Sequence, residues 1–475
     1  MIRKKLGIAA LISALGALTG CANLAPDFVR PAAPVAESWP ETGRSVVGEG
    51  RALAEIGWQE FFTDARLKQL VELSLQNNRD LRVAALNIDK ARAQYQIADA
   101  SRYPAINASG GQTAQQTADD LSQTGKGTIS RQYTAGIGFS SFELDFFGRV
   151  GNLKDQALEQ FLATEEARRS AHISLVAEVA NAWLTLAADQ ERLALSRETL
   201  ASQGESLKMT QRSFDAGVAT SLDLNQVRIG YESARAEVAR YTAAVAQDRN
   251  ALTLLVGTQP PAELLPTTLS EVAATLADIP AGVPSETFLQ RPDVIQAEHL
   301  LRAANASIGA ARAAFFPRIT LTASGGVASN SISNLFDSGN GTWLFMPQIV
   351  LPIFNAGSNQ ANLDSARAEQ AIRIASYEKA IQTAFREASD ALAVRATISE
   401  QIAAQTALAT AAKESYRLTD LRYQKGIDSY QPVLDALRTR ISAQQSLITT
   451  QLARQSNAVN LYKVFGGGWQ ERTAQ

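Results

Sequence analysis

The stretch 421-LRYQKGIDSYQPVLDALRTR-440 decides the fold, because it predicts a long helix, a break at Gly426 and a second long helix from about Ser429. An earlier stretch, 212-RSFDAGVATSLDLNQVR-228, has the same design with Gly217 at the break. The two glycines lie 209 residues apart, close to half the chain without its first 20 residues. A duplicated pair of long helices in an alanine-rich chain indicates an architecture built by repetition rather than a catalyst.

Composition narrows the function further. The chain has 475 residues and a formal net charge of −2, so no basic surface favours nucleic acid. His172 and His299 are the only histidines and Cys21 is the only cysteine, so the sequence predicts no Cys/His metal site. It shows no Ser/His/Asp set, and the glycines at 466–468 are interpreted as a helix stop rather than a phosphate loop. We therefore expect no enzyme.

The first residues have the pattern of an export signal. Three cations at residues 3–5 precede a short apolar run that ends in Leu18-Thr19-Gly20-Cys21. This ending resembles a bacterial lipobox, which implies that residues 1–20 are a lipoprotein signal peptide. It also implies that Cys21 carries a covalent lipid, the only added group that we expect. By family habit, Ala22 in place of aspartate favours the outer membrane. Proline-rich residues 21–63 are interpreted as an acylated tether.

The remainder divides into two similar halves. Repeat 1 is predicted at 64–257, a proline-rich connector at 258–284, repeat 2 at 285–466 and a tail at 467–475. Each repeat contains a helix, two strands, a very long helix, a break and a final helix. Alternation and composition place the strands at about 105–113 and 133–147 in repeat 1, and at about 318–328 and 343–354 in repeat 2.

Finer features of repeat 1 follow from local signals. Asp64 is a suitable N-cap for one helix that continues to about Tyr103 before Pro104. Polar residues 114–131 predict an exposed loop, and Thr220 with Asp223 has the form of a capping box. We expect a short helix at 269–276 in the connector.

The strand count has a physical consequence. Two repeats supply four strands, too few to close a barrel, and an open edge is not tolerated in lipid. Two of the four strands carry apolar faces with aromatic residues near their ends, as membrane strands do. Closure therefore requires more than one chain.

The lipobox, the duplication and the glycine-centred breaks together resemble bacterial outer-membrane efflux proteins, the TolC-like outer-membrane factors. Within them, the chain is similar to the lipoprotein branch that serves resistance-nodulation-division pumps. The resemblance implies a mostly α fold in which a homotrimer forms a 12-strand membrane β-barrel and a long periplasmic α-helical barrel. It implies a lipid-anchored location in the outer membrane, a periplasmic adaptor partner and an inner-membrane transporter. The channel itself is passive.

The resemblance also implies site residues. Gly217 and Gly426 correspond to hairpin tips that dock the adaptor and close the periplasmic aperture. Asp435 corresponds to an acidic ring in the lumen, whereas its counterpart in the first repeat is Gln226. In relatives a tyrosine is linked to an acidic residue, and the corresponding residues in this sequence are Tyr423 and Asp223. Gln424 and Asp428 stand at positions where relatives carry an arginine latch, so Lys425 is the alternative cation. Each residue also has an alternative role. Asp435 would be a solvated surface residue, Asp223 a charge at the start of a helix, and Tyr423 a packing residue between helices.

Two other functions remain open at this point. An outer-membrane factor for type I protein secretion would have the same fold. A periplasmic adaptor lipoprotein would explain the lipobox and long helices, but not the duplicated strand pairs. The sequence names neither the exported compounds nor the adaptor and pump, nor does it decide between charge pairs and packing as the latch.

Overall fold

The computed structural model describes residues 23–36, 56–123, 125–272 and 289–472. The chain divides into two compact units. Among the described residues, the strand unit comprises those within 23–32, 88–164 and 297–377, and the helix unit comprises those within 33–87, 165–296 and 378–472. Cys21 and the signal segment lie outside the described residues, as does the part of the predicted connector after Val272.

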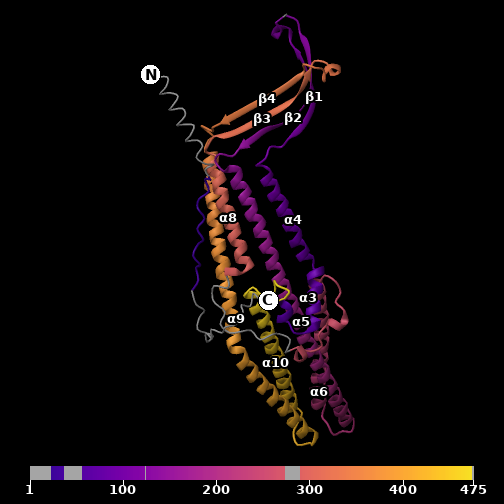
Figure 1. Ribbon diagram of the computed structural model, residues 1–475. Coiled ribbons are helices and arrows are strands. Elements are labelled where there is room, and N and C mark those ends of the chain that lie inside the picture. Colours follow the sequence, from indigo (N-terminus) through magenta and orange to yellow (C-terminus); the bar gives the residue numbers. More distant parts are fainter. Residues whose placement is uncertain (1–22, 37–55, 124, 273–288, 473–475) are drawn as a thin grey trace. The chain divides into compact units, whose positions relative to one another are not determined.

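The strand unit contains one antiparallel sheet in the order β1-β2-β3-β4 (Figure 1). Its strands are β1 (Asn107–Thr117), β2 (Thr128–Leu144), β3 (Arg318–Ser329) and β4 (Gly341–Val350). Glycines allow close approach at the centre: Gly138 lies opposite Ser324, and a Cβ there would be 2.4 Å from the Ala323 carbonyl oxygen. A bulge between Phe139 and Phe142 shifts the register of β2 against β3.

Two strand boundaries differ clearly from the prediction. The strand expected at about 105–113 runs from 107 to 117, and the one expected at 133–147 runs from 128 to 144. The predicted loop at 114–131 is therefore too long: residues 114–117 and 128–131 belong to the strands, and the connection spans 118–127 with a short helix at Asp119–Leu121. Polar side chains occupy both faces here, so no alternation marks the strands, and backbone pairing alone extends the hairpin.

The later strand pair lies nearer to its predicted position. β3 ends at Ser329 and β4 covers 341–350, so the expected strand at 343–354 begins earlier and ends earlier. Pro347 lies within β4 opposite Leu321, and it is accommodated because β4 is an edge strand.

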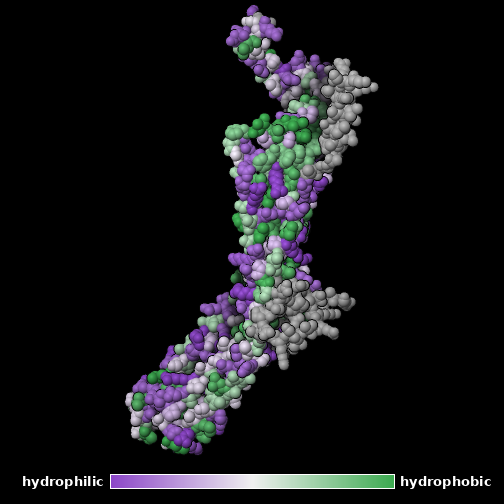
Figure 2. Space-filling view, turned by 90° about the vertical axis from the view of Figure 1, so that its left-hand side faces the viewer, coloured by the Kyte–Doolittle hydropathy of each residue, from purple (hydrophilic) through white to green (hydrophobic). Residues whose placement is uncertain are grey.

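The sheet has two open edges and little cover in a single chain. β1 and β4 each pair on one side only, and every residue of β4 is exposed. Trp343 is 82% exposed and Ile349 68% exposed. Figure 2 shows hydrophobic residues on the surface of the strand unit, interspersed with polar ones.

The long helices begin in the strand unit and end in the helix unit. α5 (Arg149–Asp215) and α9 (Ser358–Gln424) each contain 67 residues. A break follows each, and the chain continues as α6 (Ser221–Val256) and α10 (Gln431–Val464). The repeats also begin alike, with α4 (Arg79–Ala100) before β1 and α8 (Pro292–Ala313) before β3. Among the described helices, α5 alone is long and apolar enough to cross a membrane, but 61% of its most apolar window is buried within the chain.

One predicted helix is interrupted. The helix expected from Asp64 to Tyr103 divides into α3 (Ala65–Asn77) and α4, because Asn78 adopts extended backbone angles. The Asn78 side chain accepts from the Leu81 amide at 2.9 Å and donates to the Leu255 carbonyl at 2.8 Å. Asparagine thus caps α4 and ties it to the end of α6.

The core of the helix unit brings distant segments together. The predicted aromatic cluster at Trp58, Phe61 and Phe62, around the short α2 (Trp58–Phe61), is at most 2% exposed, and Phe61 stacks on Tyr462 of α10 at 3.9 Å. The C-terminal tail joins it, since the Trp58 amide donates to the Gln470 carbonyl at 3.0 Å. Both ends of the described helix unit are therefore held to its core.

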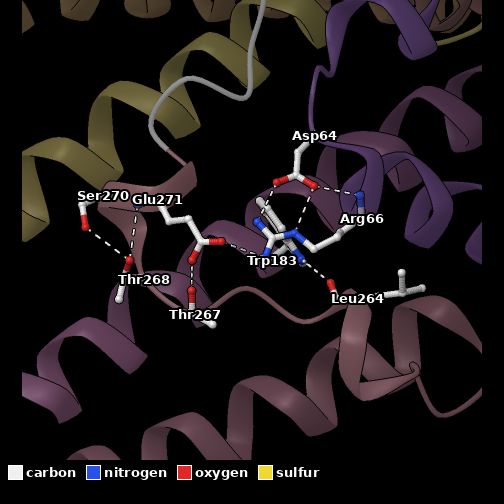
Figure 3. Close-up of polar contacts among 8 residues, drawn as sticks. All are labelled: Asp64, Arg66, Trp183, Leu264, Thr267, Thr268, Ser270 and Glu271. Carbon is white, nitrogen blue, oxygen red and sulfur yellow. Dashed lines mark hydrogen bonds and ion pairs between the residues drawn. The ribbon is translucent and has the colours of Figure 1, made fainter.

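The described part of the connector packs on α5 (Figure 3). The Trp183 indole donates to the Leu264 carbonyl, which lies in the short helix Ala262–Leu264, at 2.9 Å. Arg66 lies over the Trp183 ring and pairs with Asp64 at 2.8 Å and with Glu271 at 3.1 Å. Glu271 belongs to α7 (Leu269–Val272), the described part of the predicted short helix.

Candidate functional site

The candidate site is formed by the two hairpin tips of the helix unit. Gly217 and Gly426 have φ angles of +76° and +70°, and no atom lies within 4 Å of a Cβ built at either position. The left-handed backbone, rather than lack of space, therefore favours glycine. The turns are closed alike: Val218 donates to the Ser213 carbonyl at 2.8 Å, and Ile427 donates to the Arg422 carbonyl at 3.0 Å. This is the C-terminal hydrogen bond of a Schellman motif.

The first tip is stabilised by its own residues. The predicted capping box is confirmed, with the Asp223 amide donating to the Thr220 hydroxyl at 3.1 Å and the Thr220 amide donating to the Asp223 carboxylate at 2.9 Å. The Thr220 hydroxyl also lies 2.6 Å from that carboxylate. These hydrogen bonds lower the pKa of Asp223. The carboxylate is thus engaged at the start of α6.

The second tip carries an ion pair across its turn. Arg422 lies 2.6 Å from Asp428, on the other side of Gly426. The hydrogen bond from Arg422 holds the pKa of the Asp428 carboxyl below its usual range. Arg422 was not among the predicted latch residues, although an arginine and an aspartate six positions apart around a glycine turn are visible in the sequence.

Gln424 and Asp435 make contacts near the second tip. The Gln424 amide donates to Asp420 at 2.8 Å within α9, and burial raises the pKa of that carboxyl. Asp435 accepts from the Gln431 amide at 3.1 Å and lies 3.6 Å from Arg438. Gln431 in turn accepts from Gln226 at 3.2 Å, so Asp435 is linked to its counterpart in the first repeat.

Tyr423 contacts the first hairpin, but through Thr210 rather than Asp223. The two hydroxyl oxygens of Tyr423 and Thr210 are 3.3 Å apart. A second tyrosine acts beside it, since the Tyr430 hydroxyl donates to the Gln203 side-chain oxygen at 2.9 Å. The tyrosine rings meet edge to face with centroids 5.1 Å apart. We call these four residues the tyrosine clasp; Gln203 and Thr210 are seven residues apart and lie on one face of α5.

The Tyr430 half of the clasp is the more deeply buried. Gln203 is 0% exposed and Tyr430 1% exposed. Burial raises the pKa of Tyr430, so its phenol stays protonated and donates. A Cβ at Gly230 of α6 would lie 2.4 Å from the Gln203 oxygen, so the glycine leaves room for this side chain. In the described part of the chain the Gln203 side-chain nitrogen is buried without a hydrogen-bond partner.

Sequence reasoning identified Tyr423 but missed Gln203, Thr210 and Tyr430. Gln203 and Tyr430 are 227 residues apart, and neither lies in a local motif. Only the packing of α5 against α10 brings them together. The signal available in the sequence was the pair of tyrosines on either side of Gly426.

The two histidines lie in separate environments. Burial, followed by the charge of Arg168, lowers the pKa of His172 to about 4, and its ring contacts Trp469 of the tail. His299 lies 2.7 Å from Glu159 in the strand unit. Within the residues that the structure describes, no group of three or more His, Cys, Asp or Glu side chains is arranged to hold a metal ion.

A duplicated chain with open-edged strands and paired helical hairpins matches a known family. The model of the family described as "Outer membrane efflux protein" matches residues 70–258 and again residues 283–467. The chain belongs to the outer membrane efflux protein family.

Individual relatives agree with this membership. The efflux protein is 51% identical over 460 residues to "Antibiotic efflux pump outer membrane protein ArpC" and to "Toluene efflux pump outer membrane protein TtgC", both of Pseudomonas putida. Each match covers 96% of this chain and 95% of the relative. The open-state structure of the MtrE outer membrane channel of Neisseria gonorrhoeae superposes with a TM-score of 0.84 at 35% identity, covering 96% of this chain and all of that one.

These matches decide between the functions left open by the sequence. The efflux protein is an outer-membrane channel component of an efflux system, and it is located in the outer membrane. The periplasmic adaptor alternative is wrong, because the family match spans both repeats including their strands. The relatives' names favour efflux over type I protein secretion.

Proposed function

We propose that three copies of this efflux protein form a passive export duct, with a 12-strand barrel in the outer membrane and a helical barrel in the periplasm. The supporting observation is the four-stranded sheet with two unpaired edges and a fully exposed β4. Unpaired backbone groups are costly in lipid, so further strands must pair with β1 and β4. Three sheets of four strands give an even-numbered, closed barrel.

The proposed assembly includes a lipid and two protein partners. Cys21 carries acyl chains that add a second attachment to the outer membrane. The hairpin tips at Gly217 and Gly426 dock a periplasmic adaptor, which connects the duct to an inner-membrane transporter of the resistance-nodulation-division class. That transporter supplies the energy, because the duct itself is passive.

The cargo is proposed to be small organic molecules. Two relatives with the same 51% identity are named for antibiotic and for toluene efflux. Similar outer-membrane components therefore serve pumps named for different compounds. We infer that selection among substrates occurs mainly in the inner-membrane partner.

The tips are proposed to form the closed periplasmic aperture. Asp435 from each copy contributes to an acidic ring that favours cations at the mouth. Tyr423 and the rest of the tyrosine clasp hold the two hairpins of one chain together, Asp223 supports the first tip, and Gln424 supports the end of α9. Opening requires the hairpins to separate.

Planar-bilayer recording tests the aperture. The purified protein should show small, rare conductance events, and Asp435→Ala or Tyr423→Phe should increase their size or frequency. Arg386→Ala, at an exposed ion pair with Asp390 in α9, is the matched control. Unchanged conductance in both variants would contradict the gate residues while leaving the duct intact.

Two further measurements test the assembly. Native mass spectrometry should give three chains per particle, and projection images should show threefold symmetry. A stable monomer or dimer would contradict the barrel. Acyl labelling should be lost in Cys21→Ser, and labelling that persists would contradict the lipid anchor.

A further inference from the structure

The segment that follows the acylation position is docked on the strand unit by a ladder of contacts. Asn23 accepts from the Asn152 amide of α5 at 2.9 Å. The carbonyl of Leu24 then accepts from Arg312 of α8 at 3.1 Å. The carbonyl of Pro26 accepts from Asn305 of α8 at 2.7 Å. The ladder therefore begins two residues after Cys21 and continues along α8.

Side chains complete the ladder. Arg302 lies over the Phe28 ring with its guanidinium carbon 4.4 Å from the ring centroid, a cation–π arrangement. Arg30 pairs with Glu298 at 2.5 Å, and Glu298 also pairs with Arg302 at 2.7 Å. The Glu298 side chain is only 9% exposed, so this carboxylate is shielded from solvent although the Arg30 side chain is 57% exposed.

The spacing on the two sides of the ladder is complementary. The partners on α8 lie at 298, 302, 305 and 312, steps of four, three and seven residues that place them on one helical stripe. The contacts on the other side come from alternate residues 24, 26, 28 and 30, as an extended chain running antiparallel to α8 requires. One continuous register satisfies all four contacts.

Buried polar groups support the α8 side of the ladder. Asn305 is 8% exposed, and its side-chain oxygen accepts from Gln370 of α9 at 2.8 Å. Asn152 is 2% exposed and also donates to the Gly148 carbonyl at 2.6 Å. A Cβ at Gly309 would lie 2.6 Å from the Asn152 side chain, so Gly309 leaves room for it.

We propose that residues 23–30 are a strap that attaches the mature amino-terminal segment to α8 without help from the lipid, and that this strap determines where the acylated cysteine stands beside the channel. The proposal rests on the proposed acylation of Cys21 only for its second half. Two residues of extended chain span at most about 7 Å, so fastening Asn23 limits how far Cys21 moves from α5 and α8. The lipid then anchors a fixed point of each chain instead of a loose tether.

A spin label at Val29 tests the strap, because Val29 is 79% exposed and a label there faces solvent. The electron paramagnetic resonance spectrum of the labelled Val29→Cys protein is recorded with Cys21 present. It is recorded again for the Cys21→Ser protein, which is exported with an ordinary cleavable signal sequence. Both should show the same restricted line shape. The sequence has no other cysteine, so an acylated chain takes one label.

Substitutions within the strap provide a second test. The double variant Phe28→Ala, Arg30→Ala leaves every α8 residue in place. It should raise the population of chains whose segment is detached, and whose label is therefore mobile, at least about tenfold. The control is Arg367→Ala in α9, whose exposed pair with Asp364 takes no part in the ladder. Conductance should be unchanged in both.

The outcomes separate the strap from the anchor. A label that becomes mobile in Cys21→Ser would overturn the strap, because the lipid would then be what holds the segment. Unchanged mobility in the Phe28→Ala, Arg30→Ala protein would overturn it as well. Two labels per chain with Cys21 present would contradict acylation, and the Cys21→Ser recording would still decide on the strap.

Discussion

The two hairpin tips have the same backbone turn but use different contacts to hold it. At the first tip, Thr220 and Asp223 bond to each other, and the start of α6 is complete without the other hairpin. At the second tip, α10 begins at Tyr430 without a side-chain cap, and the Tyr430 hydroxyl instead bonds Gln203 of α5. The first tip therefore depends on local sequence, whereas the second combines a local ion pair, Arg422–Asp428, with a hydrogen bond to the first hairpin.

This difference predicts distinct roles for the repeats in the proposed aperture. A self-contained first hairpin can serve as the fixed element, and a second hairpin fastened to it through the clasp can be the element that moves. Duplication supplied one backbone twice, and divergence at a few side chains made the copies unequal. The following experiments test that contrast, starting with the largest expected effect.

Tyr430→Phe should have the largest effect, because it leaves the buried Gln203 amide without its hydroxyl partner. We expect a loss of about 1–3 kcal/mol in the free energy of unfolding. The midpoint of thermal unfolding in detergent should fall, and bilayer conductance should increase. Tyr416→Phe is the control: it lies in the same apolar cluster, and phenylalanine retains the ring contact with Arg440. Equal effects of the two substitutions would contradict the clasp.

Asp223→Ala removes the N3 side chain of the capping box but leaves the Thr220 cap, so we expect a cost of at most about 1 kcal/mol, the usual value for a lost N-cap residue. Because Asp223 bonds within its own tip, we expect faster hydrogen exchange around residues 218–224 and little change in conductance. Asp215→Ala, at the exposed end of α5, is the control. A conductance increase as large as that of Tyr430→Phe would show that the first tip acts directly in the aperture.

Asp248→Asn tests the packing between α5 and α6, the two helices of the first hairpin. Burial, followed by the nearby Asp189, raises the pKa of Asp248 from 3.8 to about 6, and one of its oxygens is buried without a partner among the described residues. A raised carboxyl pKa means that the folded chain binds the proton more tightly, so stability falls as pH rises from about 4 through 6. Because asparagine does not ionise, Asp248→Asn removes this loss of stability at higher pH.

The Asp248→Asn protein should unfold about 2 °C higher than the parent at pH 7.5, on the scale expected for a large chain. It should show no such gain at pH 4. Asp390→Asn, an exposed acid of α9, controls for the change in net charge. A gain that is the same at both pH values would exclude the titration of Asp248 as its cause.

Asp428→Asn should have the smallest effect. The Arg422–Asp428 pair is exposed, with 55% and 29% of the two side chains accessible, so we expect only a small fall in the midpoint of thermal unfolding. The difference in unfolding midpoint from the parent should disappear in high salt. A large, salt-resistant loss would mean that this pair, rather than the clasp, holds the second tip.

Local signals accounted for much of the architecture. Gly217 and Gly426 predicted the tips, and the Thr220–Asp223 pattern predicted the capping box, because both depend on residues within one turn. Local signals failed where the structure depends on contacts with residues distant in the chain. The loop predicted at 114–131 was too long at both ends, because there β1 and β2 are stabilised by pairing rather than by an apolar face. Asn78 interrupts a helical pattern through its contact with Leu255, far away in the chain.

The sequence by itself determined the duplication and the glycine-centred breaks, and it led to the proposal that strands from other chains close the barrel, because periodicity and strand count follow from the order of residues. Only the tertiary structure decided that Tyr423 meets Thr210, that Tyr430 meets Gln203, and that residues 23–30 dock on one stripe of α8. These contacts join positions hundreds of residues apart. They depend on which helical faces meet, and no local pattern of residues specifies that.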